Sequence, residues 1–270
     1  MMISRFFAFS LFLISASLQA QSFNIMATVH PLAMVAASLV APDQIEVLIP
    51  TGMSPHDFAL RPSDIERLQE ADVILWNGPN AEPFLQGFAQ RWPDKIWLSA
   101  APSDAPANAD DHWWFNPHVM LDLQHQLALV LEREERSFEV ALQAQLQTSQ
   151  EALAAVRHHG FFVFHRAYDH WVEVMQLNQV GAFTLSPEQK PGLRTLHRMR
   201  QQLQQGEVQC VFSEPQFSPA LIDSVTRGLN IRRGELDPMA AHIPLSANAY
   251  VEFIADLTER FVACLTPETP

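Results

Sequence analysis

Four histidines and one aspartate are the side chains of this sequence best placed to do chemistry, because each lies at or near the end of a predicted strand or in a loop before a long helix. Open parallel sheets bind their ligands at the carboxyl ends of the strands. Several imidazoles with one carboxylate are a typical ligand set for a transition metal, above all zinc. The residues are His30, His56, His112, His165 and Asp237.

The spacing of these residues is wide and irregular, so spacing alone gives the metal hypothesis little specificity. A single histidine after a strand is more often a packed core or capping residue than a ligand, and His30 in particular fits either role. The sequence has no His-Glu-x-x-His, Gly-x-Ser-x-Gly or Walker motif. A metalloprotease helix, a serine-hydrolase elbow and a phosphate-binding loop therefore lack support.

The elements that must position these residues alternate between short apolar runs and longer amphipathic ones. This alternation predicts parallel βα units and an α/β fold class, with two lobes joined by a long backbone helix and a metal site in the cleft between them. Strands are expected at residues 23–29, 45–49, 73–76, 96–98, 161–164, 181–183, 208–212 and 231–236. Helices are expected at residues 31–40, 62–71, 119–157, 193–203, 219–227 and 247–263.

The helical pattern at 119–157 contains no glycine or proline, although Ser137 could divide it in two. Such a helix would be long enough to span a small protein. We therefore expect a signal peptide at 1–20, an N-terminal lobe at 21–133, a connecting helix at 134–157 and a C-terminal lobe at 158–270.

Composition and charge restrict the class of protein further. The 270 residues carry 17 Lys and Arg against 30 Asp and Glu, a formal net charge of −13, which disfavours nucleic-acid binding. Arg5 precedes an apolar run at 6–16, and Ala20 is a plausible cleavage residue. The run is too short to span a bilayer, so it predicts a secretory signal peptide and an exported mature chain; an uncleaved anchor is the alternative. We also expect the mature chain to be a monomer.

Cys210 and Cys264 are the only two cysteines. An exported compartment permits a disulfide between them, and two separate buried thiols are the other possibility. The absence of Cys-x-x-Cys gives no support to a redox enzyme or a zinc ribbon.

Six segments, taken in order, resemble motifs of the periplasmic zinc-binding proteins of ABC transporters. Three of them surround histidines, and the resemblance as a whole extends from about Phe23 to Leu265, nearly the whole mature chain. They are GMSPHDFALRPSD at 52–64, NGPNAEPF at 77–84, HWWFNP at 112–117, FVFHRAY at 162–168, SEPQF at 213–217 and LDPM at 236–239.

The resemblance implies a zinc-binding protein without enzymatic activity, located in the periplasm, that delivers Zn²⁺ to a membrane permease. By resemblance, His56, His112 and His165 are the imidazole ligands, and Asp237 is a fourth ligand or the neighbour of a bound water. His30 becomes an alternative or supporting candidate. The two cysteines fall where zinc-specific members carry a disulfide.

Some features depart from the family pattern. Pro55 stands where some zinc members have an acidic residue, and residues 98–111 contain no histidine, whereas many zinc members have a His-rich loop there. Manganese-type members carry a carboxylate in place of His165, so manganese or iron binding is the alternative within the family. A secreted zinc hydrolase, with Glu82 or Glu214 as its base, is the alternative outside it.

Overall fold

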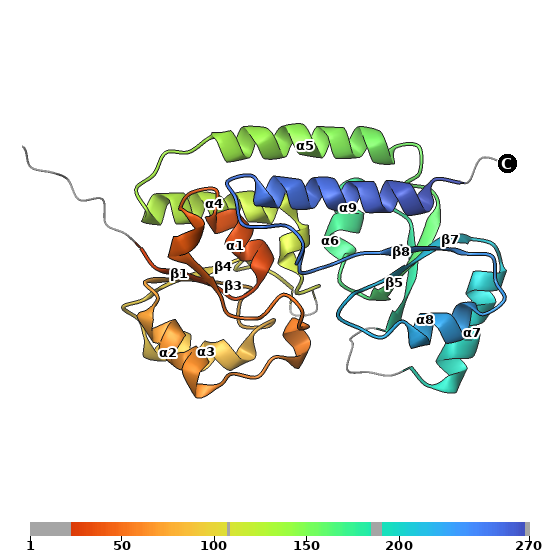
Figure 1. The fold of residues 1–270 in the computed structure, drawn as a ribbon, viewed down its shortest axis with the longest axis horizontal. Coiled ribbons are helices and arrows are strands. Elements are labelled where there is room, and N and C mark those ends of the chain that lie inside the picture. The colour runs from red at the N-terminus through yellow and green to blue at the C-terminus, as the bar shows by residue number, and fades with distance from the viewer. Residues whose placement is uncertain (1–22, 107–108, 185–190, 268–270) are drawn as a thin grey trace, which may run out of the picture.

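The computed structural model describes residues 23–106, 109–184 and 191–267, and it contains two four-stranded parallel sheets (Figure 1). The predicted signal peptide at 1–20 lies outside the described residues. The first sheet is formed by β1 (Ile25–Ala27), β2 (Ile45–Val47), β3 (Val73–Trp76) and β4 (Ile96–Ser99). The second is formed by β5 (Gly160–His165), β6 (Gln179–Thr184), β7 (Val208–Ser213) and β8 (Arg232–Glu235).

The two sheets have the same topology. Their strand orders are β2-β1-β3-β4 and β6-β5-β7-β8, and every pairing is parallel. Parallel pairs need a crossover connection, and helices supply it here. The prediction of two α/β lobes is confirmed, and the carboxyl ends of both sheets are available to build a shared site.

Short helices cover the sheets, and in Figure 1 α2 and α3 lie on the opposite side of the first sheet from α1 and α4. The sequence pattern did not predict α3, which contains Gly87, or the seven-residue α6. The helices of the lobes are α1 (His30–Ala36), α2 (Pro62–Glu70), α3 (Pro83–Arg91), α4 (Pro117–Val130), α6 (Asp169–Met175), α7 (Leu193–Gln204) and α8 (Ala220–Thr226).

The helical stretch predicted at 119–157 forms two helices, α4, which ends at Val130, and α5 (Ser137–Leu153), which begins at the serine expected as a possible point of division. Glu132 between them adopts a left-handed backbone conformation with φ 52°, which ends the helical hydrogen-bond pattern. The carboxylate of Glu135 then accepts a hydrogen bond from the Ser137 backbone N–H and starts the next helix. Local backbone geometry therefore overrides the helical composition of this stretch.

Two long helices, rather than one, run across both lobes. α9 (Ala249–Leu265) packs along α5 and also contacts α1 in the first lobe and β7 and β8 in the second (Figure 1). A single apolar core contains residues from both sheets together with Phe253, Phe261 and Leu257 of α9. The two lobes thus share a continuous core along this pair of helices.

Cys210 and Cys264 form a disulfide, with their Cα atoms 5.8 Å apart, so this expectation is confirmed. Cys210 belongs to β7 and Cys264 to the last turn of α9. The bond therefore fastens the second sheet to the helix that also contacts the first lobe.

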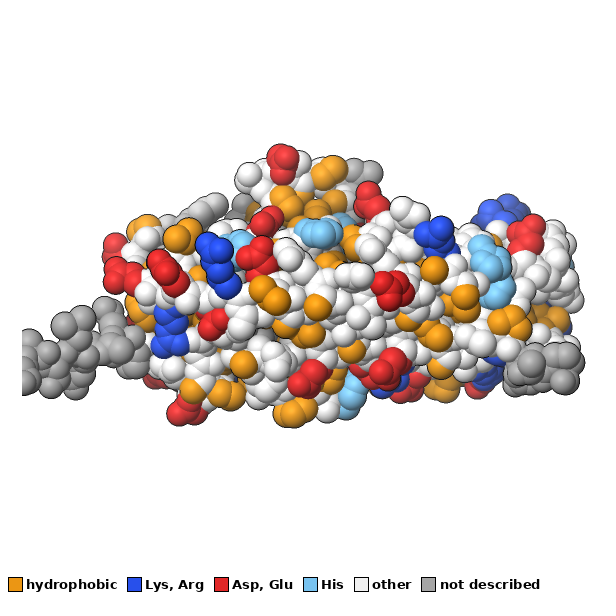
Figure 2. Space-filling model, turned by 90° about the horizontal axis from the view of Figure 1, so that it is seen from above, with side chains coloured by type: hydrophobic (Ala, Val, Ile, Leu, Met, Phe, Trp, Pro, Cys, Tyr) orange, Lys and Arg blue, Asp and Glu red, His pale blue; other side chains and the backbone are white. Residues whose placement is uncertain are grey.

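Figure 2 shows the face over α5, on which acidic, basic and apolar side chains are interspersed rather than gathered by type. In the described part of the chain, no helix is long and apolar enough to cross a bilayer.

Candidate metal centre

His56 is placed by a short helical turn, Pro55–Asp57, in the loop after β2. The Ser54 hydroxyl accepts a hydrogen bond from the His56 backbone N–H at 3.3 Å, and Pro55 occupies the first position of the turn. A hydroxyl cap followed by proline is a strong signal for a helical start. This local geometry presents the His56 ring beside the end of the first sheet.

His112 comes just before a second short turn, Trp113–Phe115, which leads into α4. Asn116 caps α4 through its side-chain oxygen, and Pro117 begins the helix. The indole N–H of Trp114 donates to the Pro238 carbonyl at 2.9 Å, and the Trp114 carbonyl accepts from the Tyr250 hydroxyl at 2.8 Å. These bonds link the His112 turn to the second lobe and to α9.

His165 is the last residue of β5, the strand that pairs with both β6 and β7. The residue is 3% exposed. The Glu214 side chain, which follows β7, lies against it, with the His165 Nδ1 atom 2.8 Å from Oε1 and 2.7 Å from Oε2. A neighbouring strand thereby fixes the orientation of this imidazole.

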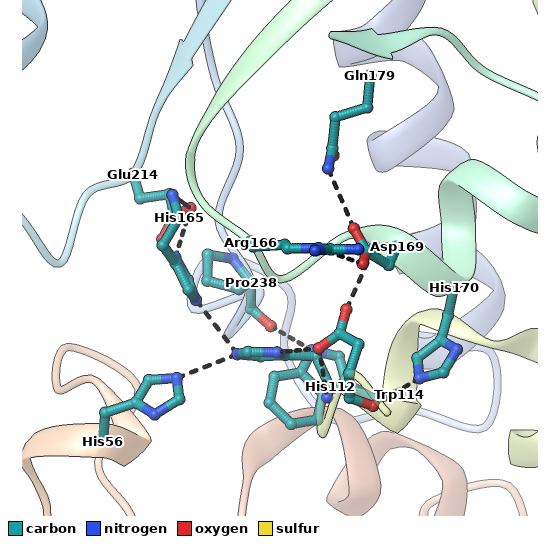
Figure 3. A network of polar contacts seen from close by, with 11 residues as sticks. His56, His112, Trp114, His165, Arg166, Asp169, His170, Gln179, Glu214 and Pro238 are labelled. Atoms are coloured by element: carbon teal, nitrogen blue, oxygen red, sulfur yellow. Dashed lines mark hydrogen bonds and ion pairs between the residues drawn. The ribbon is translucent and has the colours of Figure 1, made fainter. Parts of the chain in front are cut away.

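The structure brings these three histidines into one cluster (Figure 3). The Nε2 atom of His112 lies 3.2 Å from Nε2 of His56 and 3.2 Å from Nε2 of His165. Two nitrogens bound to one tetrahedral zinc at about 2.0–2.1 Å are separated by about 3.3 Å. The observed separations therefore match two edges of a zinc coordination tetrahedron.

The protonation pattern of two of these rings also calls for a cation between them. Nδ1 of His112 lies 2.5 Å from the Asp110 carboxylate, and Nδ1 of His165 faces the Glu214 carboxylate. A carboxylate accepts hydrogen bonds, so each Nδ1 carries the hydrogen, and in the neutral rings both Nε2 atoms are lone-pair acceptors. Two acceptors at 3.2 Å attract each other only through a shared proton or metal ion.

Asp110 affects the charge state of His112 as well as its orientation. Burial lowers the pKa of His112, but the charge and hydrogen bond of Asp110 outweigh this effect, and the pKa is raised above its ordinary value. Burial acts to raise the pKa of Asp110, and the interaction with His112 outweighs it, so that the pKa is lowered. Carboxylate–histidine pairs of this kind orient metal ligands and increase their basicity.

Two hollows reach the cluster from outside. One, of about 320 Å³, is lined by His56, His112 and the three carboxylates Asp110, Asp111 and Asp169, together with Arg166. The other, of about 330 Å³, lies beside Phe58, Phe84 and Glu82. The first gives a cation a path bordered by negative charge.

The other two predicted site residues lie outside the cluster. Asp237 accepts hydrogen bonds from Gln216 Nε2 at 2.7 Å and from the backbone N–H groups of Met239 and Ala241. His30 begins α1, and its Nε2 lies 2.9 Å from the Ile243 carbonyl oxygen. Within the described residues, these three histidines are the only group of three or more His, Cys, Asp or Glu side chains whose ligand atoms all lie within 4.8 Å of one another, and no carboxylate belongs to this group.

Sequence reasoning assigned no role to Asp110 and considered Glu214 only as a hydrolase base. In the structure, the carboxylates of both residues are hydrogen-bond partners of clustered histidines. The signal for Asp110 was an acidic residue two positions before a candidate ligand. Glu214 carried no local signal, because it is 49 positions from His165 and meets it only through the pairing of β5 with β7.

Comparisons with known proteins identify the family of the chain. Residues 25–264 match the family model described as ZnuA, zinc-uptake complex component A, periplasmic. The high-affinity zinc uptake system protein ZnuA of Yersinia pestis is 34% identical over 307 residues, covering 94% of this chain and 96% of the relative. The protein of the same name from Haemophilus ducreyi is 29% identical, covering 90% of this chain and 93% of the relative.

Solved structures share the fold. A ZnuA crystal structure has a TM-score of 0.76 at 18% identity and covers 91% of this chain and 100% of the neighbour. The laminin-binding protein Lmb of Streptococcus agalactiae, described as an adhesin with metal-transporting activity, has a TM-score of 0.79 at 18% identity, with the same coverage. The Pseudomonas aeruginosa solute-binding protein FpvC, in complex with Mn²⁺, has a TM-score of 0.75 at 20% identity and covers 90% of this chain and 98% of the neighbour. On the family match and the Yersinia pestis relative, this chain belongs to the ZnuA family of periplasmic zinc-uptake components.

Proposed function

We propose that this chain captures one Zn²⁺ ion between His56, His112 and His165 in the periplasm and delivers it to the membrane permease of a zinc ABC transporter. The observation that carries the proposal is the pair of 3.2 Å separations between Nε2 atoms, which fit zinc–imidazole geometry. The family description and the names of the relatives support zinc uptake as the process.

The ligand set favours zinc over manganese. Three imidazole nitrogens suit zinc, which accepts tetrahedral nitrogen-rich sites, whereas Mn²⁺ prefers oxygen ligands at higher coordination number. The Mn²⁺ bound in the FpvC structure belongs to a neighbour that shares the fold at 20% identity. Binding of manganese or iron is therefore the second candidate function. A zinc hydrolase is a weaker candidate, because the Glu214 carboxylate, which could have been its base, is hydrogen-bonded to His165.

Release is part of the proposed task, and the structure suggests how the ion could leave. His56 and His112 come from the first lobe and its connection to α4, while His165 comes from the second lobe. Any movement between the lobes would therefore separate the ligands. The shared core along α5 and α9 restricts such movement, so we expect small displacements rather than wide opening.

The direct test is a competition titration of the purified mature chain with Zn²⁺ and Mn²⁺ against a chromophoric chelator. We expect one Zn²⁺ per chain and tighter binding of Zn²⁺ than of Mn²⁺. A His118→Ala variant is a matched control, because His118 is an exposed histidine on α4. Stoichiometric metal binding without turnover of ester or peptide substrates would separate a binding protein from a hydrolase. Preference for Mn²⁺, or no bound metal, would contradict the proposal.

A further inference from the structure

A small cavity lies inside the histidine cluster and limits what can complete the coordination of a bound ion. Its volume is about 10 Å³. This is about the space needed for one water-sized sphere, so an ion held there leaves no room for an additional water on that side. Besides the three histidines, its walls are formed by Ser54, Pro55, Trp114, Gln216, Phe217, Pro238 and Met239.

Most of these wall residues have no side-chain oxygen or nitrogen that is available to bind an ion. The Pro238 carbonyl accepts the indole hydrogen bond of Trp114, and the Ser54 hydroxyl accepts the backbone N–H of His56. Met239 offers only a thioether, which is a weak ligand for zinc. The remaining polar side chain is that of Gln216.

The Oε1 atom of Gln216 is buried and has no hydrogen-bond partner within the described structure. A buried amide oxygen without a hydrogen-bond partner is energetically unfavourable, so such an atom requires an explanation. Oxygen of this kind is an acceptor with two lone pairs and is a chemically suitable metal donor.

The two hydrogen-bond acceptors beside the Gln216 amide determine its orientation. Its Nε2 atom lies 2.7 Å from Asp237 Oδ1 and 3.4 Å from the Thr51 carbonyl oxygen. Both neighbours are acceptors, so the NH₂ group must face them and the amide cannot be reversed. Neither Asp237 nor Thr51 lines the cavity, whereas Gln216 does.

We propose that Gln216 Oε1 is the fourth donor to the bound ion, and that Asp237 is a positioning residue that holds the Gln216 amide with its oxygen toward the cluster. This inference rests on the proposed function. It gives the Asp237 carboxylate a task different from direct ligation, in agreement with the three hydrogen bonds that it already accepts. The resulting site has three imidazole nitrogens and one amide oxygen.

The test uses the full mature chain loaded with Co²⁺, whose visible spectrum reports the coordination of the ion, and azide as a small anion that replaces bound water. We expect azide to leave the spectrum of the wild type unchanged, because no water occupies the fourth position. In Gln216→Ala, water enters this position, azide then alters the spectrum, and Zn²⁺ affinity falls at least about tenfold. Gln201→Ala, at an exposed glutamine on α7, should behave as the wild type.

Asp237→Asn provides a second variant that keeps Gln216 in place. The new side-chain amide can reverse the Gln216 amide and turn its NH₂ group toward the ion, so we expect Zn²⁺ affinity to fall by about 10- to 100-fold, the range for a supporting residue. In the Gln216→Ala background the same change should have almost no further effect, because the residue that it positions is gone. This loss of effect distinguishes positioning from a general structural role.

Three results would overturn the inference. The first is a wild-type Co²⁺ spectrum that responds to azide, the second is a Gln216→Ala affinity within twofold of the wild type, and the third is an Asp237→Asn effect that is unchanged without Gln216. If Gln216→Ala does not fold, the azide response and affinity of Asp237→Asn decide the question. Failure of the proposed function is distinct, since the wild-type chain would then bind neither Co²⁺ nor Zn²⁺.

Discussion

His30 and His165 stand at corresponding places in the two lobes but have different environments. Each comes at or just after the end of the strand, β1 or β5, that lies second in its sheet. His165 is the last residue of its strand, and its Nδ1 faces the Glu214 carboxylate. His30 lies three residues past its strand, is the first residue of α1, and contacts the Ile243 carbonyl through Nε2.

The comparison teaches that a strand-end position is not enough to make a metal ligand. His165 has a carboxylate on Nδ1, which leaves Nε2 with a lone pair directed at His112. In His30, Nε2 itself is the atom used in the contact with Ile243. A ligand is thus identified by which ring nitrogen the protein engages and which it leaves for the ion.

The largest effect on Zn²⁺ affinity should come from removing His165, and removing His30 should have little effect. We expect His165→Ala to weaken Zn²⁺ binding by more than about 100-fold, because a site with three imidazoles keeps too few ligands after losing one. His30→Ala should leave Zn²⁺ affinity within about threefold of the wild type. Competition titration of both variants checks this. Equal losses in the two variants would remove the distinction between the two positions.

A smaller loss of Zn²⁺ affinity should come from replacing Glu214, the carboxylate that lies beside His165 and has no counterpart at His30 in the described part of the chain. We expect Glu214→Gln to weaken Zn²⁺ binding by about 10- to 100-fold, since the amide supports the Nδ1 hydrogen less strongly and no longer increases the basicity of the ring. Glu207→Gln, at an exposed glutamate just before β7, is the matched control. Isothermal titration measures both, and an unchanged affinity in Glu214→Gln would show that His165 needs no such partner.

The pH dependence of binding should reveal the corresponding partner of His112. A proton competes with Zn²⁺ for the Nε2 lone pair, and the pKa of His112 is raised: burial acts to lower it, but the charge of Asp110 outweighs burial. As the pH is lowered, Zn²⁺ affinity should therefore begin to fall while the pH is still above 6.5. Protonation of the His112 ring alone should lower the affinity by up to tenfold per pH unit. Asp110→Asn should move the onset to lower pH, whereas Asp122→Asn, at an exposed aspartate on α4, should not. Identical onsets in all three proteins would contradict the assignment.

The smallest effect on Zn²⁺ affinity should come from Glu82, a second buried carboxyl group after a strand. Burial raises the pKa of Glu82 from 4.5 to about 7, and its oxygens accept hydrogen bonds from the Asn77 backbone and side chain rather than from a histidine. Between these two pH values the folded chain holds a proton that the unfolded chain has lost. The free energy of unfolding should therefore decline by up to ~3 kcal/mol as pH rises across this range.

A glutamine side chain does not titrate, so the stability of Glu82→Gln, measured as its denaturant midpoint, should not show the decline with rising pH that Glu82 causes. Its Zn²⁺ affinity should stay close to that of the wild type. Denaturation of both proteins at pH 5 and pH 8 gives the comparison. A pH dependence that is the same in both would show that Glu82 is ionised in the folded chain throughout.

Much of the fold follows from the sequence pattern, because buried parallel strands read as short apolar runs and each is followed by a helical stretch. The helices α3 and α6 were missed; α3 contains Gly87, which weakens its helical pattern. A division of the helical stretch was considered at Ser137, where α5 begins, but the left-handed Glu132 that follows α4 has no strong sequence signal.

The three clustered histidines could be proposed from their motifs, and the structure places them together. The Glu214 partner of His165 could not be proposed, because this contact depends on the pairing of strands far apart in the chain. The contact of Gln216 with Asp237 likewise joins two separate loops and has no local signal. The division of the chain into domains at residues 20, 133 and 157 stays a prediction.

X-ray absorption at the zinc edge of the Zn²⁺-loaded mature chain tests the central claim most directly, because it counts and identifies the atoms bound to the ion. The account predicts four light-atom ligands at about 2.0–2.1 Å, of which three show the outer-shell scattering of imidazole rings. A shell dominated by carboxylate oxygens, or one with fewer than three imidazoles, would contradict the assignment of His56, His112 and His165 as the zinc site.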